Sequence, residues 1–238
     1  MIATVLLTTT LLLESISAAN MQLYLKPDDP LWNTYLTYNE AVKLHRAERY
    51  EEAEALYRDV ISQKKDLWEA HNNLGNVLNS MNRESEALQV YHYGMEQTKS
   101  DENLKEIHAS FLNNIGHQKL LKAGNSFQKL REAKKYFVMA TTSDPNQVDA
   151  RYNAGNIEAK LGYIDRAMNV FFEILKTHPN HVSSWLEIGN LYFKKNNYEM
   201  AEQYHRKAAY VLVCVVSSLK TPYQLTNSIA VSQSLGMD

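Results

Sequence analysis

The chain has 238 residues, of which 45% are hydrophobic and 22% are charged, a composition typical of a globular protein that can bury a core. Its formal net charge is −2 and it has no long basic run, which argues against nucleic acid or anionic lipid as a partner. The 8 glycines and 5 prolines are too few for the many turns of a β-sandwich or barrel, and the single cysteine, Cys214, excludes an intramolecular disulfide.

Residues 1–19 form an apolar leader. The run from Ile2 to Leu13 is too short to span a bilayer, and the small residues near Ala18 would suit a signal peptidase, but no basic residue precedes Lys26. The segment fits a secretory signal, a short leader without that role, or the end of a longer membrane segment. We expect the secretory pathway if it acts as a signal and the cytoplasm otherwise, membrane association only through this segment, and a linker at 20–33.

A period of 34 residues follows the leader. Small residues recur with this spacing, interrupted by one longer gap, at Ala53, Ala87, Ala133, Ala167 and Ala201. Four residues after each of them stands a ring, in Tyr57, Tyr91, Phe137, Phe171 and His205. A second set of small residues lies earlier in each unit, at Ala41, Gly75, Gly116, Gly155 and Gly189. Such a period predicts helical hairpins that bury their apolar stripes by stacking, with small residues where two helices touch.

The pattern resembles the tetratricopeptide-repeat family, most closely the arrays of the O-GlcNAc-transferase type. The unit nearest to the family motif contains Trp185, Ile188, Gly189, Tyr192, Ala201 and Ala208. The resemblance implies an all-α fold, a right-handed α-solenoid of five stacked hairpins, and a role in binding other proteins.

We expect five helix pairs between residues 34 and 213. Their predicted bounds are 34–46 and 50–63, 68–81 and 84–97, 104–122 and 128–141, 147–161 and 164–177, and 181–194 and 198–213. Extra residues near 99–105 are expected to lengthen a helix or the loop between two repeats, and those near 123–127 to lengthen a turn. Residues 214–238 are predicted to be a tail in which Thr221 and Pro222 begin a short covering helix.

Motifs for catalysis or cofactor binding are missing from the sequence. It has no His-Glu-x-x-His, no cysteine pair, no glycine-rich phosphate loop and no Gly-x-Ser-x-Gly. We therefore predict a protein that is not an enzyme and that has no cofactor, no metal and no small-molecule substrate. His205 occupies the ring position of its repeat and is expected to be at least half-buried.

Amide side chains recur at two positions of each first helix, one turn apart, on the face predicted to line a concave groove. The candidate binding residues are Asn39, Asn73, Asn76, Asn114, His117, Asn153, Asn156, Glu187 and Asn190. An amide both donates and accepts, so a row of them can pair with the backbone of an extended peptide, as in the asparagine ladder that the resemblance implies. The alternative is that these amides bond one helix to the next.

The predicted function is a non-catalytic scaffold that holds an extended segment of a partner protein or peptide in this groove. Two alternatives remain open: an accessory or fragment of a membrane-associated glycosyltransferase-type repeat protein, and a self-associating structural adaptor. The carboxylate clamp of chaperone-binding repeats is disfavoured, because Asn72 and Asn113 stand where it needs Lys or Arg.

Overall fold

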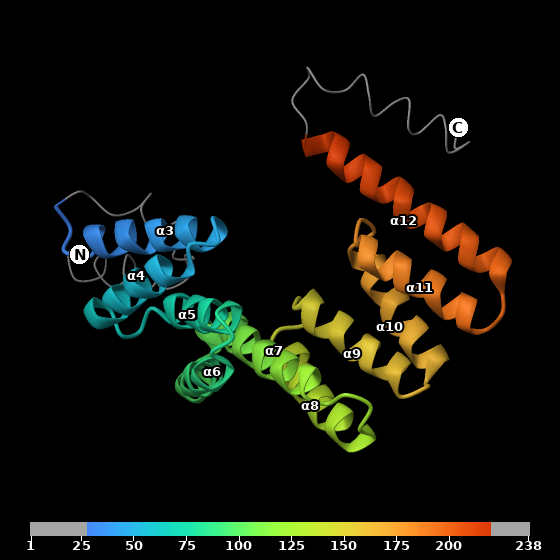
Figure 1. The fold of residues 1–238 in the computed structure, drawn as a ribbon, viewed down its shortest axis with the longest axis horizontal. Helices are drawn as coiled ribbons and strands as arrows, with labels where there is room; N and C mark the ends of the chain where they lie inside the picture. Colours follow the sequence, from blue (N-terminus) through green and yellow to red (C-terminus); the bar gives the residue numbers. More distant parts are fainter. Residues whose placement is uncertain (1–27, 220–238) are drawn as a thin grey trace, which may run out of the picture. The chain divides into compact units, whose positions relative to one another are not determined.

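The computed structural model describes residues 28–219, with side chains to residue 215, and every regular element in this range is helical (Figure 1). The elements are α3 (Trp32–Arg46), α4 (Tyr50–Gln63), α5 (Trp68–Ser80), α6 (Glu84–Thr98), the 3₁₀ turn η1 (Glu102–Leu104), α7 (Lys105–Leu121), α8 (Phe127–Ser143), α9 (Val148–Lys160), α10 (Ile164–Thr177), α11 (Val182–Lys194) and α12 (Tyr198–Leu219). The chain divides into two compact units at Gln147 and Val148, so α3–α8 form unit 1 and α9–α12 form unit 2. The predicted all-α class is confirmed.

Unit 1 contains three helical hairpins, α3–α4, α5–α6 and α7–α8, coloured blue to green in Figure 1. Each helix packs on the next one in the chain, and α5 also contacts the first helices of both neighbouring hairpins, α3 and α7. The first helices therefore lie next to one another along one side of this unit.

Unit 2 contains two hairpins, α9–α10 and α11–α12, in which each helix again packs on the next. Its core includes Phe171, Ile174 and Ile188, all fully buried. Both units are therefore built by stacking hairpins, as a solenoid requires.

Rings resting on glycines fix the register of the hairpins. A Cβ atom added to Gly75 would lie 2.3 Å from a carbon of the Tyr91 ring, and one added to Gly189 would lie 2.3 Å from His205. The glycines are needed because a larger residue would push the ring out of the core. The small residues of the second helices, such as Ala53 and Ala167, are fully buried, as their spacing predicts.

The extra residues of the third hairpin are shared between helices and loops. The α7–α8 turn spans 122–126, whereas the other four turns within hairpins have three residues, and α8 begins earlier relative to Ala133 than α6 does relative to Ala87. The insertion before Gly116 likewise lengthens the start of α7 and adds η1 to the connection from α6. The longer turn expected near 123–127 lies at 122–126, and most of the added residues extend helices instead.

The middle residue of every turn within a hairpin has a positive φ angle, the left-handed backbone conformation. Glu48, Asn82 and Asn196 have φ angles of 60°, 61° and 58°, while Gly162 and Gly124 have 85° and 53°. Gly and Asn tolerate this conformation, which lets a short turn reverse the chain between antiparallel helices.

The last helix is longer than the sequence pattern predicts. α12 runs to Leu219 instead of ending at residue 213, so the tail predicted to begin at 214 starts as helix. The helix continues because residues 210–216 contain neither Gly nor Pro to stop it. The predicted leader and the covering helix from Thr221 lie outside the described residues. None of the helices between residues 28 and 219 has the length and apolarity that crossing a bilayer demands.

Candidate binding surfaces

The first helices of unit 1 are joined by amide hydrogen bonds. Nδ2 of Asn73 on α5 donates to the phenol oxygen of Tyr38 on α3 at 3.0 Å. Nδ2 of Asn114 on α7 lies 2.9 Å from Oδ1 of Asn72 and 3.1 Å from Oδ1 of Asn76, both on α5. Side chains separated by 35 to 42 residues in sequence therefore connect three consecutive first helices.

A second link joins α5 and α7 one turn further along. Nε2 of Gln118 donates to Oδ1 of Asn79, and Oε1 of Gln118 is buried with no hydrogen-bond partner in the described part of the chain. The sequence prediction did not include these two residues or Tyr38. We call the surface formed by Tyr38, Asn72, Asn73, Asn76, Asn79, Asn114 and His117 the first-helix face of unit 1.

The amides at the second groove position bond to the ring of their own hairpin. The phenol of Tyr91 donates to Oδ1 of Asn76 at 2.7 Å, and Nε2 of His205 lies 3.1 Å from Oδ1 of Asn190. The half-buried His205 ring therefore takes the same role as a tyrosine, which agrees with the burial predicted for it.

The remaining predicted site residues differ in their hydrogen bonds and in their exposure to solvent. In unit 2, Nδ2 of Asn190 lies 3.4 Å from Glu187, and Asn156 bonds to Tyr152. Asn39 and Asn153 are half-buried and make polar or ring contacts of their own, while His117 is exposed. The structure thus brings together Asn73, Asn76 and Asn114 in unit 1, and Glu187 and Asn190 in unit 2, and several of these amides serve the helix-to-helix bonding that was the alternative interpretation.

Burial controls the titration of groups near these surfaces. It raises the pKa of Tyr38 to about 12, with the Glu69 carboxylate adding to the effect. Burial also lowers the pKa of His71, so both side chains are neutral near pH 7. No group of three or more metal-ligating side chains occurs among residues 28–219.

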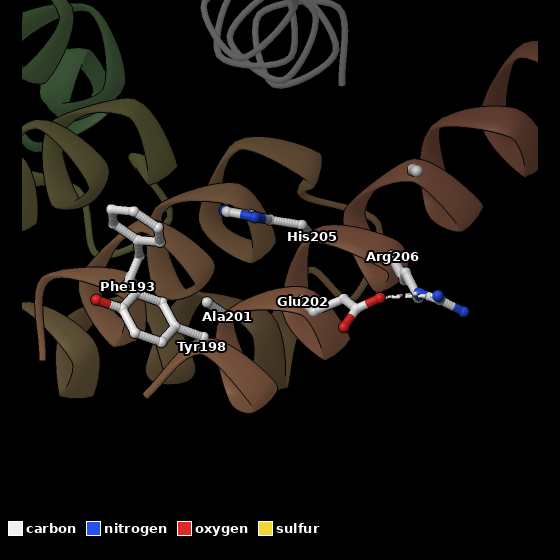
Figure 2. Close-up of a pocket in the computed structure, with 7 residues that line it drawn as sticks. Phe193, Tyr198, Ala201, Glu202, His205 and Arg206 are labelled. Atoms are coloured by element: carbon white, nitrogen blue, oxygen red, sulfur yellow. Dashed lines mark hydrogen bonds and ion pairs between the residues drawn. The ribbon is translucent and has the colours of Figure 1, made fainter. Parts of the chain in front are cut away.

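Two of the depressions elsewhere on the described surface lie along second helices, α12 in one case and α4 and α6 in the other. One, of about 470 Å³, follows α12 and is shown in Figure 2. At one end of it the rings of Phe193 and Tyr198 meet with centroids 5.3 Å apart, and further along α12 Glu202 and Arg206 form an ion pair of 2.8 Å. The other, of about 610 Å³, lies between α4 and α6.

Comparison with known proteins assigns the class. Family models of the tetratricopeptide repeat match residues 38–93 and residues 182–211. These segments lie in α3–α6 and α11–α12 and include the ring-on-glycine contacts of Gly75 and Gly189. The chain is therefore a tetratricopeptide-repeat protein, a class of helical scaffold for protein interactions.

Solved structures of MamA share the fold. A crystal structure of MamA has 16% sequence identity and a TM-score of 0.53, with 72% of this chain and 93% of that chain covered. MamA from Desulfovibrio magneticus RS-1, from residue 41 to its end, has 13% identity and a TM-score of 0.54, with 75% of this chain and 94% of that chain covered. A comparison with curated protein sequences gives no significant match.

Proposed function

We propose that the chain is a non-catalytic scaffold that holds an extended segment of a partner protein along the first-helix face of unit 1. The observation that carries the proposal is the row of half-buried amides on α5 and α7, whose donors are used within the protein. Nδ2 of Asn73 and of Asn114 point to acceptors on the preceding first helix, which fixes the orientation of both amides. Their Oδ1 atoms can then accept hydrogen bonds from backbone N–H groups of a bound segment.

The spacing of these acceptors suits an extended chain. Packed helices lie roughly 8 to 10 Å apart, and an extended peptide rises about 3.3 Å per residue, so one amide meets every third residue of the segment. Recognition through backbone N–H groups would tolerate many side chains on the partner.

A photo-crosslinking residue in place of the exposed His117 would identify the segment that binds this face. The affinity of that segment, made as a synthetic peptide, is then measured by calorimetry for the parent protein and for the double variant Asn73→Ala, Asn114→Ala. Two lost hydrogen bonds should cost roughly 1 to 3 kcal/mol, or about five-fold to 150-fold in affinity. Asn125→Ala, in the exposed α7–α8 turn, is the matched control and should bind like the parent.

N-methylation of the peptide separates backbone recognition from a general loss of stability. Methyl groups on the N–H groups that meet the amides should weaken binding to the parent and have little further effect on the double variant. Equal weakening in both proteins, or unchanged affinity in a folded double variant, would contradict the proposal.

A further inference from the structure

The depression between α4 and α6 is lined mainly by second helices and shares no residue with the first-helix face. Its lining comes from α4 and the residues that follow it, from α5 and from α6: Arg58, Ile61, Ser62, Lys65, His71, Leu74, Gln89, Val90 and Tyr93. Its volume is about 610 Å³, enough for more than one side chain. We call it the second-helix pocket.

The same positions in unit 2, 114 residues later, are filled by aromatic rings. Phe172, Trp185 and Tyr204 stand where unit 1 has Arg58, His71 and Val90. The Tyr204 ring lies 6.0 Å from Phe172 and stacks 5.9 Å from Trp185, between centroids. The largest single difference is Val90, because valine has no ring to fill the position that Tyr204 fills beside Trp185 in unit 2. The Tyr93 ring, three residues later on α6, contacts His71 from a different position of the helix.

An aromatic wall borders this space. The His71 ring lies 5.1 Å from Trp68 and 5.5 Å from Tyr93, and the Tyr93 side chain is 50% exposed. Nε2 of His71 lies 2.9 Å from the carbonyl oxygen of Lys65, an acceptor, so the neutral ring carries its proton there and donates. The wall thus offers ring faces and edges to an aromatic side chain.

The rim carries one available positive charge. Lys65 is exposed and forms no ion pair with the described residues, whereas Arg58 pairs with Glu54 at 2.8 Å. The acidic groups close to Lys65 along the chain are engaged, Asp66 with Lys64 at 2.8 Å and Asp59 with Gln63 at 2.9 Å. A carboxylate on a bound molecule would therefore find Lys65 free to pair with it.

We propose that the second-helix pocket binds a segment of a partner protein that inserts an aromatic side chain next to a carboxylate. The inserted ring takes the space between Val90 and Tyr93 that Tyr204 occupies in unit 2, and the carboxylate pairs with Lys65. This site is separate from the first-helix face, so either can fail without the other.

Three blocked dipeptides test the proposal on the full chain by amide NMR: N-acetyl-Trp-Asp-amide, N-acetyl-Trp-Asn-amide and N-acetyl-Ala-Asp-amide. The Trp-Asp probe should shift the backbone amides of Lys65, Val90 and Tyr93. The Trp-Asn probe should bind about two- to five-fold more weakly, the worth of an exposed ion pair, and the Ala-Asp probe should leave these amides unshifted.

Variants assign the effect to the two features of the pocket. Val90→Tyr supplies the missing ring and should abolish binding of the Trp-Asp probe, and Tyr93→Ala, at an exposed position, should weaken it in a protein that keeps its fold. Lys65→Gln should make the Trp-Asp and Trp-Asn probes bind equally, and Gln97→Ala, exposed at the end of α6, should change nothing. Equal shifts from all three probes, shifts confined to other surfaces, or full affinity in the Tyr93→Ala variant would overturn the proposal.

Discussion

The phenol of Tyr91 donates a hydrogen bond of 2.7 Å to Oδ1 of Asn76, whereas the equivalent pair in the first hairpin is Tyr57 and Val42. Tyr57 is fully buried, and its hydroxyl makes no well-formed hydrogen bond among the described residues, although the Asn73 amide lies near enough to lower its pKa against the effect of burial. Valine cannot accept a hydrogen bond, so the phenol of Tyr57 lacks the acceptor that Asn76 gives to Tyr91.

This difference predicts opposite results for the same substitution. Tyr91→Phe should lower the free energy of unfolding by about 0.5 to 1.5 kcal/mol, because it removes a satisfied hydrogen bond. Tyr57→Phe should be neutral or stabilising, since it removes a buried hydroxyl whose proton has no acceptor among the described residues. Urea denaturation of both variants checks the pair, and equal destabilisation would show that Tyr57 has a partner in solution.

A substitution at a helix contact tests the register of unit 2. Ala167 is fully buried on α10, so Ala167→Glu would force a charge into the core and should lower the free energy of unfolding by roughly 2 to 4 kcal/mol. Asn169→Glu, at an exposed position of the same helix, is the control and should unfold like the parent in a thermal scan. A parent-like transition for Ala167→Glu would mean that the position is not a core contact.

Buried and half-buried histidines predict a loss of stability in mild acid. Burial is the main cause that lowers the pKa of His45, His71, His108 and His181. With these folded-state pKa values below the ordinary value of 6.5, the unfolded chain binds protons more readily as pH falls. The contribution of these histidines to the free energy of unfolding should therefore be fully present above about pH 7. It should be lost as the pH drops through 6.5 toward the lowered pKa values.

The urea midpoint measured at pH 7.5, 6.5 and 5.5 checks this direction. His71→Gln keeps a donor for the carbonyl oxygen of Lys65 but cannot titrate, so it should reduce the dependence on pH. A midpoint that rises toward pH 5.5 would contradict the assignment.

The exposed apolar side chains of α12 predict a role for the residues that follow it. Tyr210 is 39% exposed and Leu212 is 50% exposed, while residues 221–237 carry no charged side chain. We expect a chain that ends at Lys220 to self-associate, because it lacks the uncharged segment whose Leu225, Ile229 and Val231 could cover this part of α12. Sedimentation across a concentration series compares it with the full chain; a truncated chain that stays monomeric and equally stable would show that the segment is dispensable.

The sequence predicts most of the fold because each repeat contributes the same signals. All the helix bounds agree within two residues except the end of α12, since small residues, rings and turns mark both ends of each hairpin. No such signal ends α12, whose last described stretch contains only helix-compatible residues.

The candidate site was predictable in position but not in its bonding. Spacing places Asn73 and Asn114 on one face of their helices, yet their partners, Tyr38 and Asn72, are 35 and 42 residues away in sequence. Which amide reaches which neighbour depends on helix packing and rotamers. The second-helix pocket was harder still to predict, because it results from the small size of Val90, which becomes informative only beside the filled equivalent in unit 2.

The third hairpin gains its extra residues at helix ends and in the turn, so the contact of Gly116 with Phe137 is kept, with an added Cβ falling 2.9 Å from that ring. The length of a hairpin can therefore change in this architecture without changing the packing register of its two helices. For protein engineering, the α7–α8 turn is a natural graft point: a foreign loop inserted between Asn125 and Ser126 would enter at two exposed residues and leave the ring-on-glycine contact undisturbed.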